Sequence, residues 1–131
     1  MKNADIHFLI ARLCLSAVFI YSGATKLIGW EDALAEFAAI GLPFPALAVI
    51  ATVAVQLAGG LAVATGYGAR AGALALACFT VAATMIGHPF WLFQGEDFHR
   101  QLTTALEHLA IVGGFLLLAA RGPGALVLGR S

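Results

Sequence analysis

Charged side chains are scarce in this sequence. Asp, Glu, Lys and Arg together make up 11% of its 131 residues, whereas 61% of the residues are hydrophobic. Soluble domains carry about 25% charged residues, and a small domain leaves much of its chain at the surface. A soluble domain is therefore excluded, and lipid is the solvent in which so much apolar surface is expected.

Other absences exclude further classes. The formal net charge is zero, so the basic face that a nucleic-acid partner requires is missing. Cys14 and Cys78 lie inside apolar stretches with no zinc-type or CxxC spacing. His88, His108 and Glu107 lack HxxH or ExxH spacing, so no metal site is expected. A Gly-rich phosphate loop is also absent.

The first apolar stretch lacks the features of a cleaved signal peptide. It is long, contains Arg12, and is followed by Ser22-Gly23-Ala24-Thr25-Lys26 rather than by a small-x-small cleavage site. We therefore interpret it as a membrane span that is retained.

Four segments, about 6–26, 46–66, 69–88 and 101–120, each supply the ~20 mostly apolar residues that a hydrocarbon core of about 30 Å requires. Only helices and closed barrels satisfy their backbone groups in lipid, and these runs do not alternate as barrel strands do. The sequence therefore predicts an all-α fold: one domain, residues 1–131, forming a four-transmembrane-helix bundle.

The connections between spans carry their own signals. Residues 29–40 place apolar side chains at helical spacing opposite acidic ones, and Gly41, Pro43 and Pro45 follow. This pattern predicts a short interfacial helix between the first two spans. Tyr67-Gly68 predicts a tight turn, and the aromatic residues 90–93 are typical of a membrane surface.

Basic residues are unevenly divided between the two ends of the predicted bundle. One end has five: Lys2, Arg12, Arg70, Arg121 and Arg130. The other has two, Lys26 and Arg100, among five acidic residues: Glu31, Asp32, Glu36, Glu96 and Asp97. Lysine and arginine in short loops mark the cytoplasmic side, so we expect both chain ends in the cytoplasm.

Ionisable side chains within a span cost about 2.5–3.5 kcal/mol at a helix centre, so each needs a partner or a role. At a rise of 1.5 Å per residue, Glu107 and His108 lie about 10 Å below the outer edge, close to the depth of Lys26 and His88. We therefore expect a Lys26–Glu107 ion pair with both histidines around it.

Arg12 lies about 9 Å inside the opposite edge, too far from Glu107 for a direct pair. We expect it to reach Gln56, near the middle of the second span, or to snorkel inward. Arg12, Ser16, Phe19, Gly23 and Lys26 share one helix face, as do Thr80, Thr84 and His88. Such stripes predict a polar interior, although threonines also bond back to their own helix.

The order of several motifs resembles the DoxX family of small membrane proteins. These motifs are Arg12-Leu13, Ser22-Gly23-Ala24-Thr25-Lys26-Leu27, Gly41-Leu42-Pro43-Phe44-Pro45, Gly59-Gly60, His88-Pro89-Phe90-Trp91, Gly113-Gly114 and Arg121-Gly122-Pro123-Gly124. The resemblance implies a four-helix membrane bundle, associated with quinone-linked oxidoreductases and membrane redox complexes. The family often has glutamate where this chain has Gln56, and a Lys-Asn pair where it has Glu107-His108.

The leading hypothesis is a redox-associated subunit of the bacterial inner membrane that binds a quinone-like or other small apolar molecule near the outer leaflet. Glu107 and His108 are the candidate catalytic residues, and, if the protein is an enzyme, it belongs to a quinone-linked oxidoreductase. The candidate ligand-binding residues are Lys26, Gln56, His88, Trp91, Tyr21 and Arg12.

Two alternatives stay open. One is a non-enzymatic scaffold or chaperone for a partner membrane protein, and the other is a small transporter that acts as an oligomer. Beyond the lipid bilayer, a membrane or redox protein and a second copy of the chain are the expected partners.

Overall fold

The computed structural model describes residues 2–129, so Arg130 lies outside the described residues. This part of the chain contains helices and no strands. The helices are α1 (Asn3–Ile28), α2 (Trp30–Ala39), α3 (Pro45–Thr65), α4 (Ala69–Gly87), the short 3₁₀ helix η1 (Phe90–Leu92) and α5 (Gly95–Arg121). Four of them, α1, α3, α4 with η1, and α5, are long and apolar enough to cross a membrane. The predicted all-α, four-span architecture is confirmed.

Glycine and proline set the ends of the central helices. Pro45 occupies the first turn of α3, where its missing N–H costs no hydrogen bond. Gly66 ends α3 at a φ of +85°, and Gly68 precedes α4 at +68°, a region in which glycine is the default residue. The predicted turn at Tyr67-Gly68 is therefore present.

Two of the helices, α1 and α5, are longer than the apolar runs that predicted them. Helix α5 begins at Gly95 rather than near residue 101, and its first turn holds Glu96 and Asp97. Negative side chains at a helix N-terminus interact favourably with its dipole, so the polar turn continues the helix beyond the apolar span. Helix α1 likewise extends at both ends, from Asn3 to Ile28.

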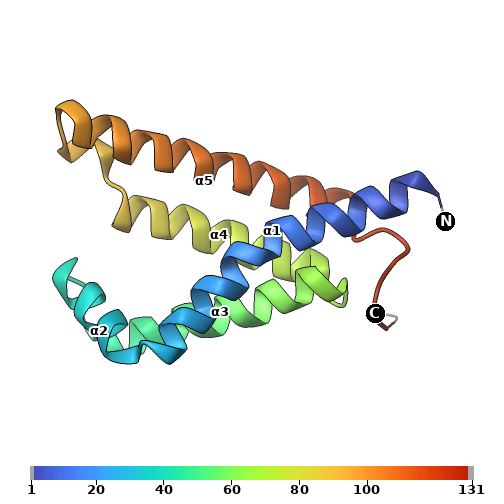
Figure 1. Ribbon diagram of the computed structural model, residues 1–131, viewed down its shortest axis with the longest axis horizontal. Coiled ribbons are helices and arrows are strands. Elements are labelled where there is room, and N and C mark those ends of the chain that lie inside the picture. The colour runs from blue at the N-terminus through green and yellow to red at the C-terminus, as the bar shows by residue number, and fades with distance from the viewer. Residues whose placement is uncertain (1, 130–131) are drawn as a thin grey trace.

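The four long helices form two unequal pairs. Helix α1 packs along α3 and α4 packs along α5, whereas α1 and α5 have few contacts. Figure 1 shows the two pairs close together near the chain termini and spread apart toward α2. We call these the terminal end and the α2 end of the bundle.

The core is small and lies between the two pairs. Phe19 contacts Phe115 with ring centroids 5.4 Å apart, and both are buried. Val63, Ala73, Leu76, Ala77 and Leu118 complete this cluster. Most other large apolar side chains are exposed, with only 11% of the α5 span buried inside the protein. Such exposure suits side chains that face lipid.

The predicted interfacial helix is α2, and it has its own contact with the bundle. Ala33 is buried against Val49 and Val53 of α3, with Trp30, Leu34 and Phe37 packed around them. This second cluster fixes α2 against the N-terminal turns of α3.

Residues 122–129 fold back across the terminal end. The Leu128 N–H donates to the Thr65 carbonyl at 2.8 Å, and the Ala125 N–H donates to Asp5 Oδ1 at 3.2 Å. The segment therefore joins the start of α1 to the end of α3.

Close helix packing depends on glycine at the α1–α3 contact. A Cβ added at Gly60 would lie 2.8 Å from Ile20 Cγ1, whereas one added at Gly113 on α5 would meet nothing within 4 Å. We expect Gly60→Leu to destabilise the protein by about 1–3 kcal/mol, the usual cost of overpacking. Gly113→Leu is the matched control and should leave the detergent-unfolding midpoint near that of the wild type. Equal midpoints for both variants would contradict this packing.

Candidate functional site

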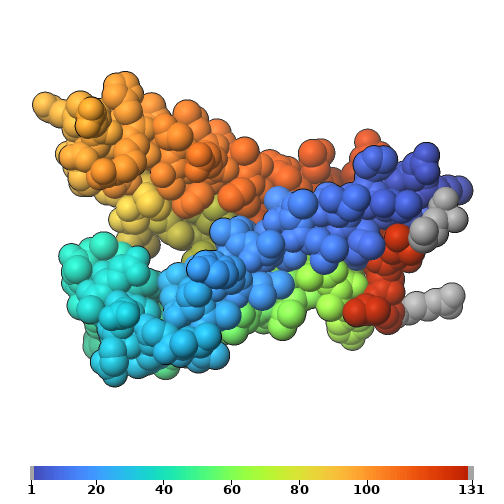
Figure 2. All heavy atoms as spheres, in the orientation of Figure 1, coloured from blue at the N-terminus to red at the C-terminus, as the bar shows by residue number. Residues whose placement is uncertain are grey.

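A cavity of about 340 Å³ opens at the α2 end, between the two helix pairs. In Figure 2 the surface is hollowed here, between α2 and the α4–α5 pair. All five α-helices contribute, and we call it the interhelical cavity. Its walls are mostly apolar, and the polar side chains that line it are Ser22, Lys26, Glu36, Thr52, Gln56, Thr80, His88 and His108.

Gln56 is a buried polar side chain in the wall of the interhelical cavity. Its side chain is 5% exposed, and its Oε1 has no hydrogen-bond partner among the described residues. A buried polar atom without a partner costs about 1–3 kcal/mol. Because Gln56 lines the interhelical cavity, a ligand that donates a hydrogen bond there would remove this cost.

Two histidines meet at the cavity wall from different helices. The rings of His88 and His108 have centroids 5.3 Å apart and are nearly perpendicular. The Thr84 hydroxyl donates to the Thr80 carbonyl at 2.6 Å, so at 2.8 Å it accepts from His108 Nδ1. Gln101 Oε1, an acceptor, lies 2.8 Å from His88 Nδ1. With Nδ1 protonated, Nε2 of each neutral ring is an acceptor.

The threonine stripe therefore has two functions. Thr80 and Thr84 bond back to carbonyls of their own helix, as the alternative interpretation held, and Thr84 also orients His108. Back-bonding satisfies the hydroxyl proton inside the bundle.

The expected Lys26–Glu107 ion pair is not formed. Lys26 Nζ donates to Ser22 Oγ at 2.7 Å, four residues earlier on the same helix. Glu107 is exposed and is not part of the cavity lining. Neighbouring helical residues point about 100° apart, so with His108 turned inward the preceding residue faces outward.

The carboxylate that does line the cavity is Glu36 on α2. The helical spacing of residues 29–40 predicts acidic residues opposite the apolar face, so Glu36 was not among the expected site residues. Glu36 is four residues before Ile40, which also lines the cavity, and residues four apart share a helix face.

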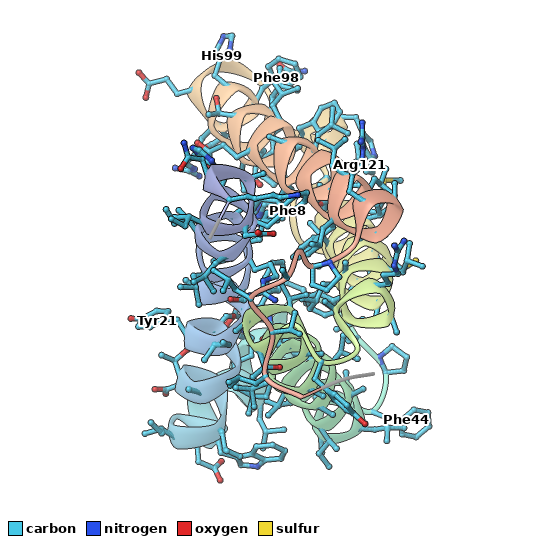
Figure 3. The ribbon with its side chains drawn as sticks, turned by 90° about the vertical axis from the view of Figure 1, so that its right-hand side faces the viewer. Phe8, Tyr21, Phe44, Phe98, His99 and Arg121 are labelled. Carbon is cyan, nitrogen blue, oxygen red and sulfur yellow. The ribbon has the colours of Figure 1, made fainter. Side chains whose placement is uncertain are left out.

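Two of the expected aromatic residues lie elsewhere. Tyr21 is 72% exposed and projects away from the bundle (Figure 3). Trp91 is 51% exposed and packs on Phe90, with centroids 5.2 Å apart. The cavity instead has Phe19 and Phe79 in its wall, in an edge-to-face pair at 6.4 Å.

Arg12 neither reaches Gln56 nor snorkels. Its side chain is 1% exposed, and its Nη2 donates to the Leu126 carbonyl of the returning C-terminal segment. Its Nε and Nη1 have no partner within residues 2–129. The guanidinium lies at Gly66, where any Cβ would collide with it. Arg12 therefore belongs to the terminal end, away from the cavity.

The two cysteines are apart from the site as well. Cys14 and Cys78 are both free and exposed on the outer surface of their spans. They do not line the interhelical cavity.

Comparison with known proteins gives consistent results. The sequence pattern that defines the DoxX family matches residues 7–89. The inner membrane protein YphA of Escherichia coli is 32% identical over 93% of this chain and 87% of its own length. The inner membrane protein YqjF of the same organism is 31% identical over 98% of this chain and 94% of its own length. No solved structure matches the chain.

Accessibility of the interhelical cavity can be measured with single cysteines in a Cys14→Ser, Cys78→Ser background. Ala83 lines the cavity, whereas Val81, two residues away on α4, is 51% exposed on the outer surface. We expect a small water-soluble thiol reagent to modify Ala83→Cys much faster than Val81→Cys, because the polar side chains in the cavity wall admit water and lipid does not. Equal rates in proteoliposomes would contradict an open cavity.

Proposed function

The chain belongs to the DoxX family of membrane proteins, and we propose that its interhelical cavity binds a quinone-like or other small apolar ring, as part of a redox-associated membrane subunit. The observation that carries the proposal is a mostly apolar cavity with an unpartnered Gln56 and an oriented histidine pair in its wall. Small-molecule sites typically combine apolar walls with a few convergent polar groups.

The geometry suggests how such a ring would be held. Phe19 and Phe79 offer an edge-to-face aromatic wall, which favours contact with another ring. Gln56 would bond one polar end of the ligand. Lys26, held by Ser22, and the Nε2 atoms of His88 and His108 would meet the other.

Proton transfer is assigned to the same groups. With Nδ1 fixed by Thr84, Nε2 of His108 is free to take a proton from a ligand hydroxyl. Glu107, the next residue on α5, stays the predicted carrier between His108 and the surface. The side chains offer no route for electrons, so a redox protein partner or a bound cofactor would receive them.

The proposed orientation places both chain ends in the cytoplasm. Lys2, Arg70 and Arg121 lie at the terminal end, and five acidic residues lie at the α2 end. Both relatives are inner membrane proteins. In the proposed orientation the cavity would open toward the outer leaflet of such a membrane, and quinones and other apolar molecules partition into the bilayer.

A binding experiment tests the proposal directly. We expect a short-chain benzoquinol, the reduced form of a quinone, to bind the purified protein saturably in calorimetric titrations under reducing conditions, because its hydroxyls can donate to Gln56 Oε1 and to a histidine Nε2. Gln56→Leu should weaken its affinity about fivefold or more, because one ligand hydrogen bond contributes about 1 kcal/mol. Gln94→Leu, the same change at an exposed position outside the cavity, should keep wild-type affinity. Wild-type affinity in both Gln56→Leu and Lys26→Ala would refute the site.

Orientation is tested by fusion at the C-terminus. Green fluorescent protein fused after residue 131 should fluoresce, and alkaline phosphatase in the same place should be inactive, because the positive-inside rule holds the terminal end in the cytoplasm. The opposite pair of results would reverse the proposed topology.

One observation favours a second function, as a scaffold for another membrane protein. Glu107 is an exposed carboxylate on a span of which only 11% is buried inside the protein. Ionisable groups in spans usually pair with another group. A partner that co-purifies with the wild type and is lost from Glu107→Leu, with no quinone binding in either, would support this function.

A further inference from the structure

A second concave site lies at the terminal end, between α1 and α5. These helices have few contacts with each other, and a groove of about 500 Å³ follows the line between them. Figure 3 shows Phe8 on α1 and Arg121 on α5, both in the groove wall, on neighbouring helices at this end. At the deep end Leu15 lies against Gly114, where a Cβ would come within 3.0 Å of it.

The groove is apolar along its length and polar only at its mouth. Ala11, Leu117 and Leu118 form its walls with the residues already named, and its ionisable members are His7 and Arg121. His7 lies in the second turn of α1 and Arg121 is the last residue of α5. Both are therefore at the membrane surface, while Leu15 and Gly114 lie within the hydrocarbon core.

The charge at the mouth is positive. Arg121 is exposed and has no acceptor among residues 2–129. Arg70 lies against the end of α5, where it donates to the carbonyls of Ala119 and Ala120. The acidic group nearby, Asp5, accepts from the Ala125 N–H.

We propose that the groove binds an anionic phospholipid, with an acyl chain between α1 and α5 and its phosphate at Arg121. From Ala4 to Leu15 the groove is about 16 Å long at 1.5 Å per residue. At the deep end Leu15 of α1 lies against Gly114 of α5, so the groove is closed there to a helix about 10 Å across, whereas a single extended acyl chain is far thinner. The apolar depth selects a lipid over a free phosphate, and the positive mouth selects an anionic head group.

This site is separate from the interhelical cavity, so the two proposals can fail independently. The test uses the full chain, delipidated in detergent, and native mass spectrometry with phosphatidylglycerol and phosphatidylcholine of identical acyl chains. We expect the first phosphatidylglycerol to bind about fivefold more tightly than phosphatidylcholine, since one surface arginine contributes about 1 kcal/mol toward anionic lipid. Equal affinities would overturn the proposal.

Two pairs of variants locate the site. Arg121→Gln should remove the preference for phosphatidylglycerol, and Arg100→Gln, at the α2 end, should retain it. Ala11→Trp fills the groove and should weaken the first binding step for both lipids, whereas Ala17→Trp, on α1 outside both cavities, should not. A preference that survives Arg121→Gln, or identical results for the two tryptophan variants, would overturn the proposal. A dimer that excludes lipid would instead assign the groove to a second copy of the chain.

Discussion

A polar group in the hydrocarbon core finds no water, so the protein itself must supply its hydrogen-bond partners. In this chain most polar side chains within spans find one on the same helix: Ser16, Thr65, Thr80 and Thr84 bond to backbone carbonyls, and Lys26 bonds to Ser22. The few polar groups that lack such a hydrogen bond are therefore informative. Gln56 Oε1, and Nε and Nη1 of Arg12, are buried and have no partner in the described part of the chain, residues 2–129. Gln56 faces a cavity that a ligand could enter, whereas Arg12 is enclosed by the chain itself.

The pairing of the helices determines where space remains. Gly60 brings α3 against Ile20 of α1, and Gly59 admits Leu76 of α4, so α3 packs closely against both of its neighbours. Helices α1 and α5 have few contacts with each other, and α2 covers only part of the gap at the α2 end. The interhelical cavity is therefore a consequence of unequal packing, and the groove beside Arg121 has the same origin at the opposite end.

Sequence predicted the features that depend on local chemistry. Hydropathy predicted the four spans, because each span depends on the lipid around it. Tyr67-Gly68 predicted the turn, because a tight turn depends on its own backbone conformation.

Of the expected site residues, Lys26, Gln56, His88 and His108 line the cavity. Glu107 and Tyr21 do not, because depth along a span can be counted from residue number whereas the direction of a side chain around the helix depends on packing between helices. The partner of Arg12 could not be predicted from the sequence for another reason. The hydrogen bond joins residues 114 positions apart, and its acceptor lies in a segment with no regular structure.

That long-range contact has a consequence for biogenesis. Arg12 enters the membrane with the first span, but the carbonyl that accepts its hydrogen bond belongs to Leu126. While the intervening helices are being synthesised, the guanidinium must rely on water, lipid head groups or the translocation machinery. The first span is therefore completed only after the three later spans have been synthesised, and a nascent chain stalled before residue 126 would carry an unshielded charge that quality-control proteases could recognise.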